Sequence, residues 1–475
     1  MPEPTTLCIA ATGQANLASV LAMCARAQVR AQVSSDAEEI LRAERVLLPG
    51  VGAFGAAMRE LSRNGLDKAI RARVEEGRPT MGICLGMQMF FSESQESPGV
   101  KGIGAIEGAV EKISSPLPLP QLGWNRIRPA ARNGFVRPGW AYFANSYKVG
   151  RLGPGLSGSL ATYGEDFYAT VERYAPGSGI PNLLLCQFHP ELSGPWGLDL
   201  FSRWMGGYPS SAAPEAVDRT GADDTALRVI PCLDIKGGRV VKGVRFENLV
   251  DSGDPAALAA RYEYEGADEI ALLDISATLE ERKTALEAVR AVRAAVSIPI
   301  SVGGGIKGAE DASRLLEAGA DRVSVNSAAV RDPGLVSALA ERFGVQCVVV
   351  AVDARKNPGG PGWEVVIDAG KRGTGLDVQE WASRCAALGA GEILLTSIDR
   401  DGTGLGYDLD LIAAVAGAAP IPVIASGGAV TQEHFLAGAR AGARAVLGAG
   451  AFHRGELSIA QVKAYLGQKG VEVRR

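Results

Sequence analysis

Histidine is scarce in this chain of 475 residues, which contains only His189, His434 and His453. The seven cysteines are an odd number and are scattered along the chain, so they do not fit a disulfide framework. No spacing of histidines and cysteines suggests a zinc site. We therefore expect a cytoplasmic protein that uses no metal and no other cofactor.

Long apolar runs and a large excess of one charge are also missing. A membrane helix requires about twenty consecutive apolar residues, and the opening "MPEPTTLCIA" lacks the basic region of a signal peptide. The net charge of −4 is small, so composition gives no reason to expect nucleic acid or a membrane as a partner. With 47% hydrophobic and 21% charged residues the chain is typical of globular proteins, and its length suits about two to four domains.

Residues 206–226 differ from the rest of the chain in composition. They are rich in glycine, proline, serine, alanine and aspartate and show no apolar periodicity, which is typical of a linker. This predicts a first domain over residues 1–205 and a second over residues 227–475.

In the first domain, short apolar runs alternate with a longer helical pattern. Residues 45–50, 79–84 and 182–188 are predicted to be buried strands, and residues 53–77 are predicted to be helical. Strands that alternate with helices predict an α/β domain with a mostly parallel sheet.

The second domain contains an internal repeat. Three segments recur in the same order, each 123 residues further on: 266–276 at 389–399, 298–306 at 421–429 and 317–326 at 440–449. Each copy carries several strand-then-helix units, so two copies give about eight. This predicts a (β/α)₈ barrel built from two half-barrels. An open doubly wound sheet is the alternative.

Acids and glycines stand at the ends of the predicted barrel strands, where function collects in such folds. Asp234 and Asp353 end strands in opposite halves, which suits a general acid and base; the alternative is that each caps the following element. Glycine pairs within 302–305 and 425–428 favour two phosphate sites, because glycine lets backbone N–H groups approach phosphate oxygens. Lys242 is either a phosphate contact or a surface lysine.

Three motifs of the second domain resemble the cyclase subunit of imidazole glycerol phosphate synthases: "RVIPCLDIKGGRVVKGVRFENLVDSGDP" (228–255), "VGGGIKGAEDA" (302–312) and "GEILLTSIDRDGTGLGYD" (391–408). The likeness stays in register from about residue 227 to the C-terminus. It implies a (β/α)₈ cyclase of histidine biosynthesis, with Asp234 and Asp353 as general acid and base. The phosphate- and substrate-binding positions that it implies are Gly304, Gly305, Asn326, Ser327, Asp401, Gly427, Gly428, Ala449 and Gly450.

The same resemblance implies a charged ammonia gate at the bottom of the barrel. Its four positions are Arg228, Glu269, Arg322 and Glu392. Arg322 stands where lysine is more usual, which keeps the charge of the gate and changes its geometry. A cyclase of this kind needs a source of ammonia, which the first domain is expected to supply.

Cys84, in "MGICLGMQMF" (81–90), is either a buried small hydrophobic residue or a nucleophile at a strand-to-helix turn. A thiol nucleophile needs a base, most often histidine, and His189 is the only histidine of the first domain. Glu191 follows two residues later, where it is able to orient the imidazole. The combination favours a Cys–His–Glu triad.

Four motifs of the first domain resemble class I glutamine amidotransferases, and in particular the glutaminase subunit of the same synthases. They are "PGVGAF" (49–54), "GICLGMQ" (82–88), "QLGWN" (121–125) and "QFHPELSG" (187–194). The resemblance implies that Cys84 attacks the glutamine amide, His189 relays the proton and Glu191 orients His189. It also implies oxyanion donors and a glutamine-binding side chain, at Gly50, Val51, Gly52 and Gln88.

This half departs from the family pattern at four positions. Ala11 and Thr12 fall in the place of the usual Asp-Tyr-Gly segment, Asn145 replaces a histidine, and Leu192 replaces a lysine that often contacts the cyclase. None of them removes the triad. They bear on how the glutaminase responds to the barrel.

Together the two resemblances imply the activity of an imidazole glycerol phosphate synthase in one chain. Glutamine would be hydrolysed at Cys84, and ammonia would pass through the barrel to the bis-phosphorylated ribonucleotide PRFAR. The glutaminase–barrel interface would then be intramolecular, with no separate partner chain. Two alternatives are a phosphoribosyl isomerase barrel and a first domain that binds without catalysis. The cysteine before Asp234 and the intact triad favour the synthase.

Overall fold

The computed structural model describes residues 6–11, 17–50, 52–129, 134–206, 224–244, 247–275 and 279–474, with only the backbone described over 242–244, 247–252 and 279–283. The described residues divide into two compact units, one lying within 1–117 and 121–225 and the other within 118–120 and 226–475. The change of unit after Thr225 lies at the end of the predicted linker 206–226, most of which is outside the described residues. The domain limits of the sequence analysis therefore stay a prediction.

The first unit is built on a six-stranded sheet in which only the β12–β13 pair is antiparallel. Its strand order is β12 (Thr170–Arg173), β13 (Leu183–Cys186), β4 (Thr80–Ile83), β3 (Arg45–Leu48), β1 (Thr6–Ala10) and β2 (Arg30–Ser34). The predicted α/β class and the three predicted strands are confirmed, because β3, β4 and β13 lie within the predicted ranges.

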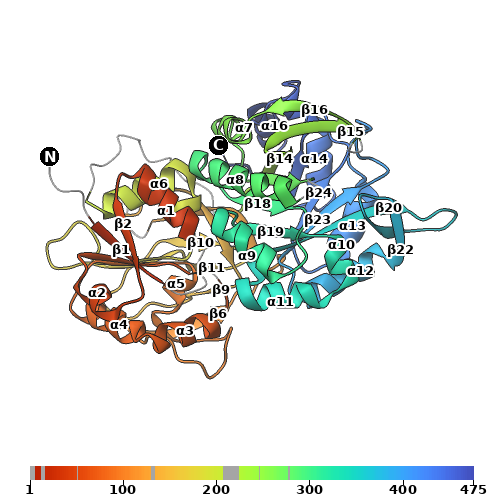
Figure 1. The fold of residues 1–475 in the computed structure, drawn as a ribbon. Helices are drawn as coiled ribbons and strands as arrows, with labels where there is room; N and C mark the ends of the chain where they lie inside the picture. The colour runs from red at the N-terminus through yellow and green to blue at the C-terminus, as the bar shows by residue number, and fades with distance from the viewer. Residues whose placement is uncertain are drawn as a thin grey trace. The chain divides into compact units, whose positions relative to one another are not determined.

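Helices cover both faces of this sheet (Figure 1). On one side lie α1 (Leu17–Arg26) and α6 (Gly194–Trp204), and on the other lie α2 (Ala37–Arg42), α3 (Phe54–Arg63) and α4 (Leu66–Glu75). The helical segment predicted over 53–77 is thus two helices. Gly65 breaks it, since its φ of +69° is a left-handed conformation that glycine adopts without steric cost.

The remaining elements of the first unit lie outside the six-stranded sheet. They are α5 (Leu85–Gln88), β5 (Phe91–Ser94), β6 (Ile106–Lys112), β7 (Gln121–Ile127), β8 (Gly139–Asn145), β9 (Tyr147–Lys148), β10 (Leu160–Thr162), β11 (Asp166–Tyr168) and the 3₁₀ turn η1 (Pro190–Leu192). Strands β7 and β8 form an antiparallel ribbon over their full length.

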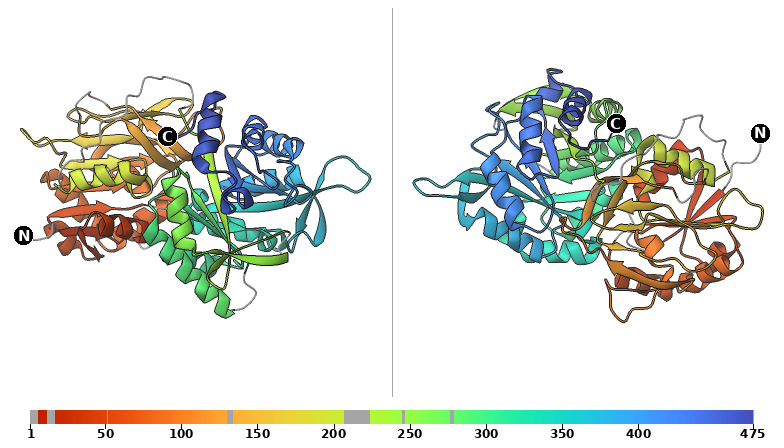
Figure 2. Two further views of the ribbon diagram at one scale, coloured as in Figure 1. Left: turned by 90° about the horizontal axis from the view of Figure 1, so that it is seen from above. Right: turned by 180° about the vertical axis from the view of Figure 1, so that it is seen from behind.

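The second unit is a closed barrel of eight parallel strands with helices on its outside (Figures 1 and 2). In order around the barrel the strands are β14 (Arg228–Lys236), β17 (Ile270–Asp274), β18 (Ile300–Gly303), β19 (Arg322–Val325), β20 (Val348–Lys356), β23 (Glu392–Ser397), β24 (Val423–Ser426) and β25 (Ala445–Gly448). Pairing of β25 with β14 closes the ring, which confirms the predicted barrel over the open sheet.

Two antiparallel hairpins and ten helices accompany these strands within the described residues. The hairpin strands are β15 (Arg239–Val244), β16 (Glu247–Gly253), β21 (Trp363–Ile367) and β22 (Arg372–Asp377). The helices are α7 (Pro255–Tyr264), α8 (Leu279–Ala295), α9 (Ala309–Ala318), α10 (Ser327–Arg331), α11 (Gly334–Phe343), α12 (Val378–Ala387), α13 (Leu409–Ala418), α14 (Gln432–Arg440), α15 (Gly450–His453) and α16 (Ile459–Gln468), with a 3₁₀ turn η2 (Val345–Cys347) before β20.

The barrel halves repeat at the predicted interval. Strand β24 begins and ends 123 residues after β18, and the same holds for β25 after β19. The barrel interior is filled by side chains that meet from strands of both halves, and the buried members of this core are Ile230, Cys232, Ala271, Val349, Leu394, Ile424, Ala445 and Leu447. The barrel is therefore a packed core.

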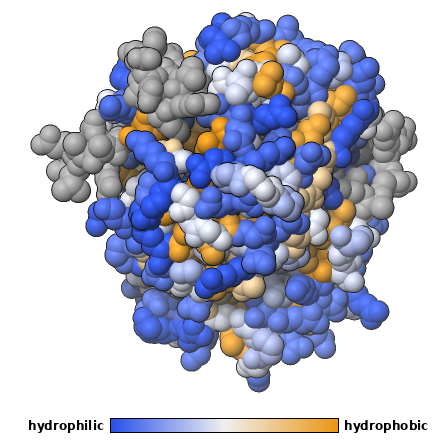
Figure 3. All heavy atoms as spheres, turned by 90° about the vertical axis from the view of Figure 1, so that its right-hand side faces the viewer, coloured by the Kyte–Doolittle hydropathy of each residue, from blue (hydrophilic) through white to orange (hydrophobic). Residues whose placement is uncertain are grey.

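Hydrophilic residues predominate on the face shown in Figure 3, where apolar residues form small separate groups. Tyr264 and Leu405 are the most exposed large hydrophobic residues of the described chain, at 93% and 67%. In the described part of the chain, no helix combines the length and the hydrophobicity needed to cross a membrane.

A buried arginine joins three elements of the first unit. The guanidinium of Arg73 is fully covered and donates to the carbonyl oxygens of Ile40 (3.0 Å), Ala43 (2.7 Å) and Pro79 (3.0 Å), among others. These carbonyls end α2, precede β3 and precede β4. Burial lowers the pKa of Arg73 to about 10, so the side chain keeps its charge at neutral pH.

We expect Arg73→Met to destabilise the first unit by about 3 kcal/mol, because it leaves several buried carbonyl groups without a donor. This corresponds to a fall of roughly 10 °C in the midpoint of that unit's thermal transition. Arg71→Met is the matched control, since Arg71 lies on the same helix and makes an exposed ion pair with Glu75 at 2.9 Å, worth less than about 1 kcal/mol. Equal shifts for the two variants in calorimetry would contradict the role of Arg73.

Candidate active sites

Cys84 lies at a strained turn directly after β4 and before α5. Its φ of 53° and ψ of −112° are rare for any residue other than glycine. Such a backbone costs about 1–3 kcal/mol and persists where the surrounding structure imposes it. The thiol is 5% exposed. The structure thus places Cys84 at the turn between strand and helix that the nucleophile interpretation requires.

Close contact between two backbone segments imposes this turn. A β-carbon on Gly86 would lie 2.1 Å from the Leu48 carbonyl oxygen, and one on Gly50 would lie 2.1 Å from the Gly86 nitrogen. Only glycine fits at either position. The end of β3 therefore packs directly against the first turn of α5, and Gly50 and Gly52 lie in this segment. Val51 lies outside the described residues, so the oxyanion donors stay a prediction.

His189 and Glu191 form a buried pair in the loop between β13 and α6. The His189 Nδ1 atom lies 2.8 Å from Glu191 Oε1, and both side chains are less than 10% exposed. Burial opposes protonation of His189, but Cys84 and Glu191 outweigh it and hold the pKa of His189 well above its ordinary value. Because Glu191 occupies Nδ1, Nε2 is the ring nitrogen that remains for the interaction with Cys84.

Serine and backbone contacts fix the turn that carries this pair. The His189 amide donates to the Tyr142 carbonyl at 2.9 Å. The Ser193 hydroxyl donates to the His189 carbonyl at 2.6 Å and accepts from the Tyr142 amide at 3.0 Å. The turn that carries His189 is therefore bonded to β8 both directly and through Ser193. No sequence pattern predicts the Ser193 contacts.

Two buried glutamine side chains, Gln88 and Gln187, lie next to Cys84. Gln88 Nε2 donates to Gln187 Oε1 at 3.0 Å and to the Tyr147 carbonyl at 3.2 Å. Gln187 Nε2 donates to the Cys84 sulfur at 3.7 Å. Both hydrogens of the Gln88 amide are thus engaged by the protein, and the predicted glutamine contact of this side chain would have to use its oxygen. Sequence reasoning missed Gln187, although it stands two residues before His189 in a motif that was singled out.

The four departures from the family pattern lie in different surroundings. Asn145 ends β8, and its Nδ2 donates to the Tyr147 carbonyl at 2.9 Å. Leu192 is 4% exposed within η1. Ala11 donates its amide to the Ser34 carbonyl at 2.8 Å, and Thr12 lies outside the described residues. Asn145 follows a residue that contacts Cys84, because the carbonyl of Ala144 accepts from the thiol at 3.8 Å.

In the barrel, Asp234 and Asp353 lie on opposite strands. They belong to β14 and β20, the first and fifth of the eight strands in the closed ring. Asp234 is 9% exposed, with the Cys232 sulfur 3.9 Å from its Oδ1. Asp353 accepts from Asn326 Nδ2 at 2.9 Å. Burial, with a smaller contribution from Asp401, raises the pKa of Asp353 to about 6, where a carboxylate is a useful base near neutral pH.

The glycine pairs repeat in detail between the two halves. Gly304 and Gly305 have positive φ, and so do Gly427 and Gly428 at the positions 123 residues later. A β-carbon on Gly304 would lie 2.0 Å from the Asp274 carbonyl oxygen, so backbone packs on backbone there.

The residues after β19 and β25 repeat as well. Asn326 (φ −125°, ψ −100°) and Ala449 (φ −129°, ψ −77°) share an unusual conformation directly before α10 and α15, and Ser327 and Gly450 begin these helices. The Asn326 amide is turned toward Asp353, and the Ser327 hydroxyl accepts from the Asp368 amide at 3.1 Å. The side chain of Lys242 is outside the described part of the structure, so its phosphate role stays a prediction.

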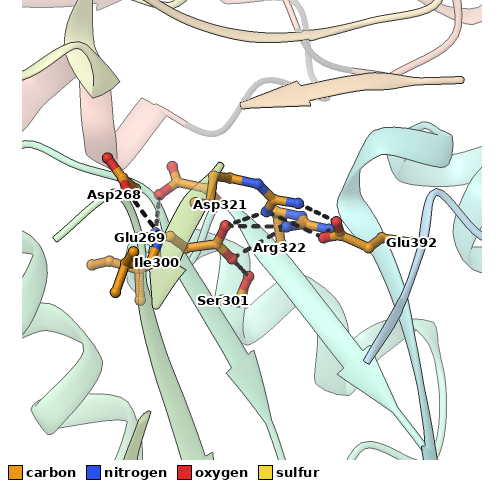
Figure 4. Close-up of polar contacts among 9 residues, drawn as sticks. Asp268, Glu269, Ile300, Ser301, Asp321, Arg322 and Glu392 are labelled. Carbon is orange, nitrogen blue, oxygen red and sulfur yellow. Dashed lines mark hydrogen bonds and ion pairs between the residues drawn. The ribbon is translucent and has the colours of Figure 1, made fainter. Parts of the chain in front are cut away.

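Four charged side chains form a closed ring at the amino ends of the barrel strands (Figure 4). Arg228 contacts Glu269 at 2.7 Å and also contacts Glu392, while Arg322 contacts Glu269 at 3.2 Å and also contacts Glu392. Ser301 donates a further hydrogen bond to Glu269. All four predicted gate residues are therefore together, with side chains at most 3% exposed.

Glu392 keeps its charge although it is buried. Burial opposes ionisation of Glu392, but Arg228 and Arg322 outweigh it and lower the pKa of Glu392 below its usual range. Each carboxylate bridges both guanidinium groups, so the charges alternate around the ring. In the described residues, no group of three or more histidine, cysteine, aspartate or glutamate side chains is arranged to hold a metal ion.

Comparison with known proteins gives two matches that cover different parts of the chain. Residues 228–458 match the family of histidine biosynthesis proteins, and residues 15–111 match the CobB/CobQ-like glutamine amidotransferase domain. Among curated proteins, the imidazole glycerol phosphate synthase subunit HisF of Pyrobaculum aerophilum is 60% identical over 253 residues, covering 53% of this chain and 99% of that protein. The chain therefore belongs to the HisF family of histidine biosynthesis cyclases and carries a glutamine amidotransferase domain ahead of its barrel.

Proposed function

We propose that this chain is a bifunctional imidazole glycerol phosphate synthase, in which the first domain hydrolyses glutamine and the barrel uses the ammonia. The observation that carries this proposal is the placement of Cys84 at a strained turn, facing a His189–Glu191 pair 2.8 Å apart, in a chain that also holds a HisF-type barrel. A cyclase barrel needs ammonia, and this triad is suited to release it.

The glutaminase reaction follows from the triad. The Cys84 thiolate attacks the amide carbon of glutamine, and the C–N bond breaks as His189 gives its proton to the departing nitrogen. Water then attacks the thioester, His189 takes a proton from it, and glutamate leaves as the thiolate re-forms. Glu191 keeps the imidazole oriented throughout. Backbone N–H groups near Gly50 and Gly52 are the proposed donors to the oxyanion.

In the barrel, the proposed substrate is PRFAR, and the products are imidazole glycerol phosphate and the ribonucleotide AICAR. PRFAR has a phosphate at each end, and the repeated glycine pairs supply one matching site in each half. Asp353 and Asp234 face the substrate from opposite strands. The raised pKa of Asp353 supports the role of base for this residue, with Asp234 as acid.

The charged ring is the proposed entrance for ammonia into the barrel. Free ammonia is mostly protonated near neutral pH and is then not nucleophilic, so a shielded route raises the yield of the cyclase. The ring of Arg228, Glu269, Arg322 and Glu392 is closed by its own ion pairs, and passage requires one of them to open. Joining both domains in one chain raises their effective concentration, which favours transfer of ammonia from one to the other.

Two alternatives are less well supported. A phosphoribosyl isomerase barrel shares the half-barrel repeat, but it has no use for a fused glutaminase. A first domain that only binds a ligand has no need of a strained cysteine beside a buried histidine–glutamate pair. All seven cysteines are buried and none of them forms a disulfide, which supports the proposal of a reducing compartment, the cytoplasm.

Cys84→Ala is expected to abolish glutamine-dependent formation of imidazole glycerol phosphate and to leave ammonia-dependent formation unchanged. The reason is that only the first reaction passes through the thioester. Glutamate release should be followed in the same assays, with and without PRFAR, to report glutaminase competence and coupling. Cys24→Ala, a buried cysteine on α1, is the control. Glutamine-dependent turnover that survives in Cys84→Ala would rule out the glutaminase assignment.

Asp353→Asn is expected to stop the cyclase with either nitrogen source. In the wild-type protein, the base must be ionised, so kcat/KM for PRFAR should fall as the pH drops through about 6. The hydrogen bond from Asn326 lowers the pKa of Asp353, so Asn326→Leu should move this limb to higher pH. The profile is measured at a constant concentration of free ammonia. A limb that stays in place in Asn326→Leu would contradict Asp353 as the base.

A further inference from the structure

A fully buried glutamine side chain contacts the sulfur of Cys84, and the mechanism above does not use it. Gln187 lies directly after β13 and is 0% exposed. Its Nε2 atom is 3.7 Å from the Cys84 sulfur. A buried amide so close to a nucleophile affects it, because an N–H group in a low-dielectric site interacts strongly with an anion.

A hydrogen bond to the oxygen of the Gln187 amide fixes the orientation of that amide. Its oxygen accepts from Gln88 Nε2 at 3.0 Å, and Gln88 is held in turn by the Tyr147 carbonyl at 3.2 Å. Asn145 Nδ2 donates to the same carbonyl at 2.9 Å. A flipped Gln187 would place its NH₂ group against that of Gln88 and its oxygen against the sulfur; the first contact is repulsive, and the second is repulsive when the sulfur is a thiolate. The N–H group is therefore directed at Cys84.

The sulfur has different partners in its two protonation states. As a thiol it donates to the Ala144 carbonyl, 3.8 Å away. As a thiolate it is only an acceptor, so that contact becomes repulsive, and the donors available are the His189 ring and the Gln187 amide. His189 gives up its proton during the reaction, whereas Gln187 keeps its N–H group throughout. Gln187 is thus the constant donor to the thiolate.

We propose that Gln187 is a positioning residue of the glutaminase, which holds the Cys84 thiolate in place through an N–H···S hydrogen bond that Gln88 and the Tyr147 carbonyl anchor. This inference rests on the proposed function of Cys84. It adds a residue that acts at both chemical steps, because the sulfur carries negative charge before the thioester forms and again when the thioester breaks. Gln88 thereby has a second task besides binding glutamine.

The test is Gln187→Met in the full chain, which replaces the amide with an apolar side chain of similar length. A hydrogen bond to a charged group is worth enough to change kcat for glutamine by about tenfold or more, with KM little changed. The rate of Cys84 alkylation by iodoacetamide, followed by mass spectrometry of its peptide, should shift to higher pH by about one unit. Ammonia-dependent cyclase activity should stay at the wild-type level.

Gln121→Met is the matched control. Gln121 is another fully buried glutamine of the first unit, and its amide atoms have no hydrogen-bond partner among the described residues. This substitution should leave the alkylation profile of Cys84 unchanged. Gln88→Met removes the anchor and keeps Gln187, so a smaller shift in the same direction is expected. If Gln187→Met does not fold, the alkylation profile of Gln88→Met tests the positioning role of Gln187 in its place.

The possible outcomes separate the inference from the function on which it rests. Wild-type kcat and a wild-type alkylation profile in Gln187→Met would overturn the positioning role while leaving Cys84 as nucleophile. The same holds if Gln121→Met shifts the profile as far as Gln187→Met. A wild-type protein that releases no glutamate in the presence of PRFAR would refute the glutaminase itself, and the alkylation profiles would still test the contact between Gln187 and the thiolate.

Discussion

Hydrogen bonding between parallel strands sets the positions of Cys84 and His189 in the first unit and of Asp234 and Asp353 in the barrel. In each unit, paired strands end at one edge of the sheet, and the residues that follow them come together there. In the first unit β4 and β13 are neighbours, so Cys84, Gln187 and His189 leave adjacent strand ends. In the barrel the ring closes with β14 and β20 on opposite sides, so the two aspartates face each other across the interior.

Each of the candidate sites lowers the stability of the unit that contains it. Cys84 has a strained backbone, Asp353 is a carboxylate whose pKa is raised by burial, and the ring residues hold full charges away from water. The strained backbone, the buried carboxylate and the buried charges would each destabilise the fold if nothing compensated for them. The rest of each unit offsets them: the contact of Gly50 with Gly86 imposes the turn at Cys84, and the two carboxylates of the ring neutralise its two guanidinium groups.

The sequence was informative where a pattern repeats and uninformative where a contact joins distant segments. The 123-residue interval predicted the paired strands and glycines of the barrel, because a repeat in sequence requires a repeat in backbone. It did not predict that Asn326 turns to Asp353, since side-chain direction depends on the neighbouring strand. The break at Gly65 was missed because helical periodicity continues on both sides of it. Gln187 was missed because its partner, Gln88, is far away in the chain.

The two sites handle buried charge in opposite ways. The barrel ring uses full charges of both signs that neutralise each other. Opening one ion pair leaves a buried charge without its partner, which is energetically costly. Around Cys84 the donors are one ionisable ring and the neutral amide of Gln187, anchored by Gln88. A neutral donor stabilises the thiolate without attracting a permanent counter-charge. This suits the proposed role of Cys84, a nucleophile whose charge appears and disappears in each cycle, whereas fixed charges suit the proposed role of the ring as a closed entrance for ammonia.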